Sequence, residues 1–118
     1  MVTYRIALGG QPYGAKRCAG DNRTPEGLYT IDSRNAASAF HRALHVSYPN
    51  PADREAARRL GCRPGGDIMI HGLPKGYAWL GKAHAVHDWT RGCIAVTNGE
   101  IEQIWRLVPN GTRVEIKP

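Results

Sequence analysis

Asp88-Trp89-Thr90-Arg91-Gly92-Cys93-Ile94-Ala95-Val96, residues 88–96, joins a polar turn to a short apolar run. The run from residue 93 to residue 96 predicts a buried strand, and the polar part predicts the loop that enters it. Cys93 lies at the junction, directly after Gly92, whose missing side chain lets the backbone approach a substrate closely. The stretch therefore predicts a strand with a cysteine at its entrance.

A second apolar strand is predicted upstream, at residues 67–71. Its core, Ile68-Met69-Ile70, lies between the turn-forming stretches Pro64-Gly65-Gly66 and Gly72-Leu73-Pro74. His71 ends this strand. If the two strands are neighbours in a sheet, His71 and Cys93 come together although 22 positions separate them in the chain.

Periodicity and turn residues predict the other elements of a β-rich fold with short helices, a single domain over residues 1–118. Four more strands are expected at residues 2–8, 28–31, 43–48 and 112–117, the first with a hairpin partner directly after it. Helices are expected at residues 53–60 and about 97–108; the second begins with a capping box from Thr97 to Glu100 and packs on the sheet. A loop is expected at residues 20–27, and a loop or lid at residues 75–88.

The composition narrows the class of partner. A formal charge of +6 favours a polyanion: nucleic acid, an anionic membrane surface or an acidic cell-wall polymer. The arginines are scattered and no basic-aromatic stripe occurs, which argues against nucleic acid. No run of eighteen apolar residues occurs, so no membrane span is expected, and the first residues do not resemble a secretion signal.

Three cysteines are present, so at least one thiol remains free. Cys18 and Cys62 are expected to be either buried thiols or a disulfide. The wide spacing of the cysteines matches no zinc site, and no metal or organic cofactor is expected.

A thiol reacts as its thiolate, and forming one at neutral pH requires a nearby cation or base. His71 is the leading candidate base for Cys93 because both residues lie where an apolar strand meets a glycine. His84 and His87 lie nearer to Cys93 in the sequence and are the rival bases.

His71-Gly72 and Thr90-Arg91-Gly92-Cys93 resemble the two motifs of the L,D-transpeptidase catalytic domain, also called the YkuD-type domain, whose pattern is His-Gly followed by Ser/Thr-His-Gly-Cys. Arg91 departs from the usual histidine, and the gap between the motifs is longer than usual. The similarity extends over nearly the whole chain, through Gly20-Asp21, residues 24–29, 47–50 and 64–66, and the helix after residues 96–98.

This resemblance implies a mixed β-sandwich and a cysteine acyltransferase. Cys93 is then the nucleophile and His71 its base, the Gly72 carbonyl holds the imidazole tautomer, and the N–H groups of Gly92 and Cys93 donate to the oxyanion. The thioester forms with a peptidoglycan stem peptide, and a diamino-acid amine resolves it to make a cross-link. Carbapenems are expected to label the same thiol.

Two other outcomes stay open within the resemblance. Water as the acceptor would make the protein a peptidase, and a cleft that binds without turnover would make it a wall-binding domain. A monomer that works in the periplasm or at the cell wall is expected, with a secreted effector as the alternative.

Five residues near the motifs are candidates for substrate binding. Arg91 suits a stem-peptide carboxylate but can equally pair with Asp88. The others can line a substrate groove, although Thr90 most simply organises the turn and an aromatic residue in a loop more often anchors that loop to the core; they are Trp89, Thr90, Tyr77 and Trp79.

Overall fold

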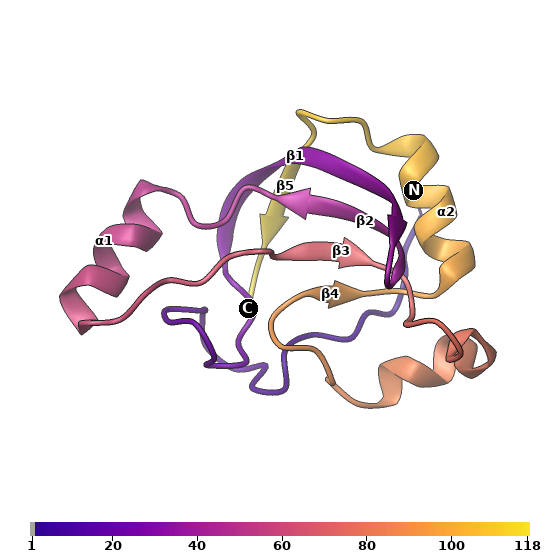
Figure 1. Ribbon diagram of the computed structural model, residues 1–118, viewed down its shortest axis with the longest axis horizontal. Helices are drawn as coiled ribbons and strands as arrows, with labels where there is room; N and C mark the ends of the chain where they lie inside the picture. The colour runs from indigo at the N-terminus through magenta and orange to yellow at the C-terminus, as the bar shows by residue number, and fades with distance from the viewer. Residues whose placement is uncertain (1) are drawn as a thin grey trace.

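One curled sheet of five strands forms the centre of the computed structural model, which describes residues 2–118 (Figure 1). The strand order is β4-β3-β2-β1-β5. Strands β3 and β4 are parallel, whereas the other three pairs are antiparallel. The strands are β1 (Gly27–Ser38), β2 (His41–Val46), β3 (Met69–His71), β4 (Ile94–Ala95) and β5 (Arg113–Ile116). The expected mixed, mainly β class with short helices is confirmed.

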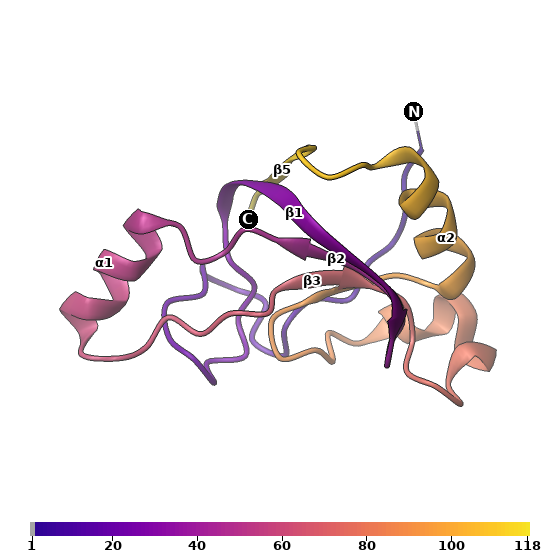
Figure 2. The same cartoon turned by 45° about the horizontal axis from the view of Figure 1, so that its top comes forward.

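Both expected helices form, and each begins with a capping box. Helix α1 (Pro51–Leu60) is capped by Asn50 and ends at Gly61, whose φ of 74° suits glycine. Helix α2 (Asn98–Leu107) is capped by Thr97 and Glu100, as the sequence predicts. Figures 1 and 2 show α1 projecting from one end of the sheet, whereas α2 lies against it at the other end.

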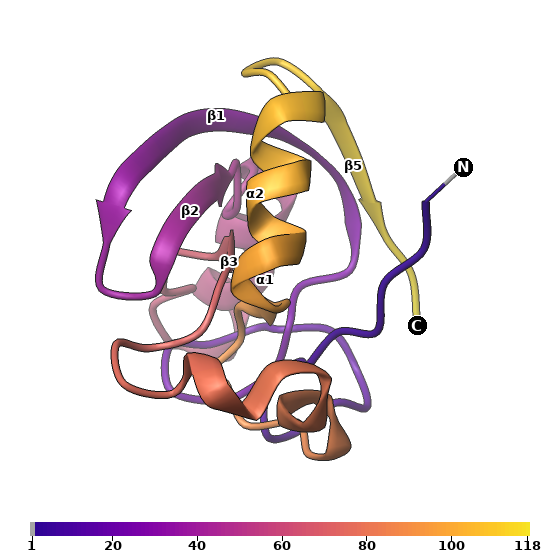
Figure 3. The same cartoon turned by 90° about the vertical axis from the view of Figure 1, so that its right-hand side faces the viewer.

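The core lies between α2 and one face of the sheet. Figure 3 shows β1 arching around α2, so the sheet wraps the helix. Because side chains alternate between faces along a strand, the even-numbered residues of β2, β3 and β4 face this core. Its buried members are Tyr29, Ile31, Leu44, Val46, Tyr48, Ile68, Val96 and Ile101, with Ile104, Trp105 and Val108 packed against them.

The prediction of a strand over residues 2–8, with a hairpin partner directly after it, is wrong in the length of the paired segment and in its partner. Only Ala7 is paired there, in an antiparallel bridge with Ala95, and the neighbours of β1 are β2 and β5. The segment follows the outer edge of β4, which is only two residues long, so it has no room to form a longer ladder. Alternation of apolar residues fits such an edge segment as well as it fits a strand.

Two other segments differ from their expected form. Strand β1 extends to Ser38, well beyond residue 31, and has a bulge between Ile31 and Ser33. The expected loop at residues 75–88 contains η1 (Ala78–Val86), two short 3₁₀ stretches joined at Gly81. None of the helices in residues 2–118 has the length and hydropathy required to cross a membrane.

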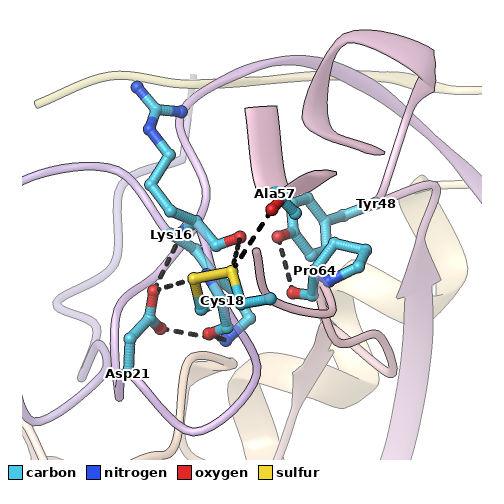
Figure 4. The surroundings of a disulfide bond; sticks show 8 residues. Lys16, Cys18, Asp21, Tyr48, Ala57 and Pro64 are labelled. Carbon is cyan, nitrogen blue, oxygen red and sulfur yellow. Dashed lines mark hydrogen bonds and ion pairs between the residues drawn. A yellow bond between two sulfur atoms is a disulfide. The ribbon is translucent and has the colours of Figure 1, made fainter. Parts of the chain in front are cut away.

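A disulfide joins Cys18 to Cys62, which settles the alternative that the sequence left open (Figure 4). It connects the long loop before β1 to the turn that follows α1. A backbone hydrogen bond from Ala19 N to Arg63 O, 2.7 Å long, reinforces the same junction. Tyr48 donates its hydroxyl proton to Pro64 O at 2.8 Å, which anchors the second segment to the core.

Replacing both Cys18 and Cys62 by serine is expected to lower the free energy of unfolding by about 3–4 kcal/mol. The bond spans a sequence separation of 44, and closing such a loop removes entropy from the unfolded chain. Urea unfolding followed by tryptophan fluorescence measures the difference. Wild-type protein with a reducing agent should match the double variant, and equal stability of the oxidised wild type and the double variant would contradict the prediction.

Candidate active site

The pairing of β3 with β4 determines where His71 and Cys93 lie. Ile70 is opposite Ile94 and His71 is opposite Ala95 in a parallel register, so Cys93, just before β4, is opposite Met69. Since Ile68 and Val96 face the core, the odd-numbered positions face the other side of the sheet. The structure therefore places His71 and Cys93 on the same face of adjacent strands.

The turn that enters β4 is held by Thr90. Its hydroxyl donates to Cys93 O at 2.7 Å and accepts from Gly92 N at 3.1 Å. Gly92 has a φ of 142°, and a Cβ at this position would lie 2.7 Å from Arg23 O. Thr90 thus positions the turn, and the missing side chain of Gly92 lets the backbone of Arg23 pack close to this turn.

The Gly92 N–H is therefore occupied by Thr90 Oγ1 in this structure. The Cys93 N–H, in contrast, has no acceptor within residues 2–118. Of the two N–H groups expected to donate to an oxyanion, that of Gly92 is thus already bound to a side chain of the protein.

The Cys93 thiol makes two backbone contacts. Its Sγ donates to Asp67 O at 3.3 Å and accepts from Met69 N at 3.4 Å. Burial raises the pKa of Cys93 above its usual range; the Met69 N–H opposes this shift, Asp67 adds to it and Lys16 opposes it. The group is accordingly a neutral thiol at neutral pH and needs a base to become a nucleophile.

His71 is held as a neutral imidazole with its Nε2 unprotonated. Its Nδ1 lies 2.7 Å from Gly72 O, a carbonyl that can only accept, so the proton is on Nδ1. The ring is 4% exposed and packs against Phe40 at 4.4 Å between ring centroids. Burial lowers the pKa of His71, the Gly72 hydrogen bond opposes this and His84 lowers it further.

Gly72 is required by its surroundings. A Cβ there would lie 2.6 Å from Asn98 Oδ1 and 2.9 Å from Phe40 O. Asn98 also accepts from Leu73 N at 2.8 Å, so it fixes the turn that carries the Gly72 carbonyl. Sequence reasoning missed both Asn98 and Phe40, because each reaches the site only through the packing of α2 and the β1–β2 turn.

No hydrogen bond joins His71 to Cys93 within the described part of the chain; the thiol points toward Asp67 instead. His71 is the last residue of β3, whereas Cys93 lies opposite Met69, the first residue of this strand. Asp67 and Ile68, which directly precede β3, line a cavity of about 270 Å³ together with Cys93. Leu73 and Pro74, beyond its other end, line a separate apolar pocket of about 370 Å³.

The structure separates the expected substrate-binding residues between these two hollows. Arg91 lines the Cys93 cavity, whereas Tyr77 and Trp89 line the apolar pocket. Trp89 also lies 6.0 Å from His71 between ring centroids. Trp79 lines neither hollow and is 77% exposed.

The rival histidines belong to the apolar pocket. His84 accepts from Trp89 Nε1 at 3.3 Å, and both His84 and His87 line that pocket. Neither lines the Cys93 cavity. Within residues 2–118, no group of three or more His, Cys, Asp or Glu side chains is arranged to hold a metal ion.

Known proteins similar to this chain share its fold. The family model of the YkuD L,D-transpeptidase catalytic domain matches residues 1–116. YafK of Escherichia coli (strain K12) is 27% identical over 110 residues, 92% of this chain and 37% of YafK. Pgp2 of Campylobacter jejuni, described as a helical cell shape determining protein, is 29% identical with a TM-score of 0.69, over 96% of this chain and 38% of Pgp2. The chain thus spans well under half the length of both relatives.

A more distant likeness extends to an L,D-transpeptidase from Mycobacterium smegmatis. Its TM-score is 0.61 at 11% identity, over 100% of this chain and 49% of the other. At this identity the likeness concerns the fold alone.

Iodoacetamide without reductant is expected to alkylate Cys93 alone, because the other two cysteines form a disulfide. Since burial raises the pKa of Cys93, the rate should still be rising with pH above about 8.5, the ordinary cysteine value. Peptide mapping by mass spectrometry at a series of pH values gives the rate. A rate that levels off below pH 7 would show a resting thiolate–imidazolium pair instead, and Cys93→Ala is the unlabelled control.

Proposed function

Because this chain belongs to the YkuD L,D-transpeptidase catalytic domain family, we propose that it is a cysteine acyltransferase acting on peptidoglycan stem peptides. The observation that carries the proposal is the parallel β3–β4 pairing, which puts a free thiol and a neutral imidazole on one face of adjacent strands. The disulfide supports a place of action outside the cytoplasm, because such bonds persist in oxidising compartments.

The first half of the reaction forms a thioester. Rotation about the Cys93 Cα–Cβ bond turns Sγ from Asp67 O toward His71 Nε2, which takes the thiol proton as the thiolate attacks the stem-peptide carbonyl. The Cys93 N–H donates to the oxyanion. The C–N bond then breaks, and the imidazolium returns the proton to the departing amine of the terminal D-amino acid.

The second half resolves the thioester. An acceptor amine attacks the carbonyl carbon, its proton passes to His71, and Sγ leaves as a thiolate that recovers this proton. The apolar pocket next to Trp89 supports transfer to an amine, since its Tyr77, Leu80 and Trp89 side chains suit the methylene chain of a diamino acid beside the base. A cross-link between two stem peptides is the proposed product.

Hydrolysis is the second candidate, and a specific observation favours it. Five residues of the segment 75–88 line the apolar pocket and none lines the Cys93 cavity, which favours access of water to a thioester formed there. With water as the acceptor, the same steps shorten the stem peptide by one D-amino acid.

Incubation with purified muropeptides that carry tetrapeptide stems distinguishes the two acceptors. Dimers joined between two diamino acids, with released D-alanine, are expected if an amine resolves the thioester. Mass spectrometry of the products gives the answer. Shortened monomers alone would assign the hydrolytic reaction, and intact muropeptides would exclude both.

His71→Ala is expected to slow acylation of Cys93 by about 10²- to 10⁴-fold, the usual contribution of a general base. The thioester with a tetrapeptide stem, or the adduct with a carbapenem, is followed by intact-protein mass. Circular dichroism checks that the variant is folded. His87→Ala is the matched control and should acylate at nearly the wild-type rate, because His87 does not line the Cys93 cavity. A larger loss in His84→Ala than in His71→Ala would assign the base to His84.

A further inference from the structure

The cavity that contains Cys93 has two walls from distant parts of the sequence. Lys16, Ala19, Gly20 and Asn22 come from the loop before β1, and residues 65–68 come from the loop before β3. Arg91 completes the lining. The Cys18–Cys62 disulfide and the Ala19–Arg63 hydrogen bond join these two loops directly. The walls are thus held at a fixed separation by covalent and backbone contacts.

Lys16 is unusual among the lining residues because it is a charged side chain that is only 4% exposed. Its Nζ donates to Asp21 Oδ1 at 3.0 Å and to Cys18 O at 3.1 Å (Figure 4). An ammonium has three N–H donors, and within residues 2–118 no third acceptor is found for this one. The remaining N–H is available to an acceptor on a ligand in the cavity that Lys16 lines.

The position of Lys16 is set by a rigid partner. The Asp21 carboxylate also accepts from the backbone N–H groups of Arg17, Cys18 and Arg23 at 2.8–3.0 Å. Burial alone would raise the pKa of Asp21, but these hydrogen bonds and Lys16 lower it to about 2. Asp21 is therefore a fixed anion that orients the Lys16 ammonium in advance, which lowers the cost of binding a ligand.

Cations outnumber carboxylates among the residues that line the cavity, and Asp21, which does not line it, pairs with Lys16 from outside the lining. Lys16 and Arg91 are its two cations, and Asp67 is the one acidic residue among the lining residues. The Asp67 side chain is 92% exposed, with His45 Nε2 3.9 Å from its Oδ1, so water screens its charge. Lys16 and Cys93 line the same cavity, so a group bound at the thiol shares that cavity with the ammonium.

We propose that the Cys93 cavity binds a carboxylate of the acyl-donor stem peptide and that Lys16 supplies the ammonium that selects it. The proposal rests on the proposed function, since it requires the donor peptide in this cavity. Two carboxylates offer the same chemistry near the attacked bond, one on the leaving D-amino acid and one on the side chain of the diamino acid. Arg91 adds a second cation at the mouth of the cavity.

The inference predicts a specificity. A charge-assisted hydrogen bond to a buried ammonium corresponds to a preference of about 10- to 100-fold in kcat/KM. A donor peptide that lacks the bound carboxylate should have a kcat/KM lower by this factor. The unmodified peptide should show the same loss in kcat/KM on a protein that lacks the Lys16 ammonium. The two losses should not add, because they remove the same contact.

Three synthetic tetrapeptide stems test this: the free acid, its terminal carboxamide, and the peptide with the diamino-acid carboxylate amidated. Each is assayed for Cys93 acylation with the wild type, with Lys16→Met and with Lys117→Met. Methionine keeps the aliphatic stem and removes the charge. Lys117 is 77% exposed at the end of β5 and does not line the Cys93 cavity, which makes it a matched control.

The wild type and Lys117→Met should prefer the free acid over one of the amides by about 10- to 100-fold, and that amide identifies the bound carboxylate. Lys16→Met should lose the preference, which is a ratio of two rates within one variant, so any effect on the Cys93 thiol that is common to all three peptides cancels. Equal rates of the wild type on all three peptides would overturn the proposal, and this result needs no variant to fold. An equal loss in Lys16→Met on every peptide would also overturn it, because Lys16 would then only support the loop.

Binding to Cys93→Ala protein separates this proposal from the proposed function. Titration calorimetry measures the affinity of this variant for the free acid and for the amide that the wild type acylates more slowly. The measurement requires no chemical step. Tighter binding of the free acid, lost in the Lys16→Met/Cys93→Ala double variant, would support the carboxylate site even if the wild type forms no thioester. Equal binding of acid and amide would overturn the site even if acylation proceeds.

Discussion

The parallel pairing of β3 with β4 is the constraint on which the rest of the site depends. Only the register Ile70–Ile94 puts Cys93 beside Met69 and His71 beside Ala95, with both reactive side chains on the face away from the core. The pair is short, so other contacts must secure it. Ala7 pairs with the free edge of β4, the Thr90 hydroxyl closes the turn before it, and Ile101 of α2 joins Val96 in the core on the opposite face.

The resting site keeps its two reactive groups neutral and apart. Burial raises the pKa of Cys93 and lowers that of His71, so the uncharged thiol and imidazole are favoured at neutral pH. The thiol is hydrogen-bonded to Asp67 O and the imidazole to Gly72 O. A buried ion pair would have to repay a large desolvation cost, which two neutral groups avoid. In the proposed mechanism that cost arises only when a substrate carbonyl is present to receive the thiolate.

The two ends of β3 border two different hollows. The residues just before the strand line the cavity that contains Cys93, and the segment after its end borders an apolar pocket near His71. The loop that carries Lys16 is joined to the loop that carries Asp67 by the disulfide, at a distance from the sheet itself. The stability of the fold and the shape of the Cys93 cavity are therefore coupled, because the bond that restricts the unfolded chain also joins the two loops that line this cavity.

The sequence by itself determined the local elements, because their signals are local. The capping box at Thr97 predicts α2, the helix-forming residues 53–60 before Gly61 predict α1, and the apolar runs before His71 and after Cys93 predict the two strands of the site. It also singled out His71 and Cys93 as candidates. What only the tertiary structure decided is which distant segments meet: residues 2–8 as an edge segment of β4, Phe40 and Asn98 around Gly72, and Lys16 beside Cys93. These contacts depend on loop closure and side-chain packing across the whole chain, and neither leaves a periodic signal in the sequence.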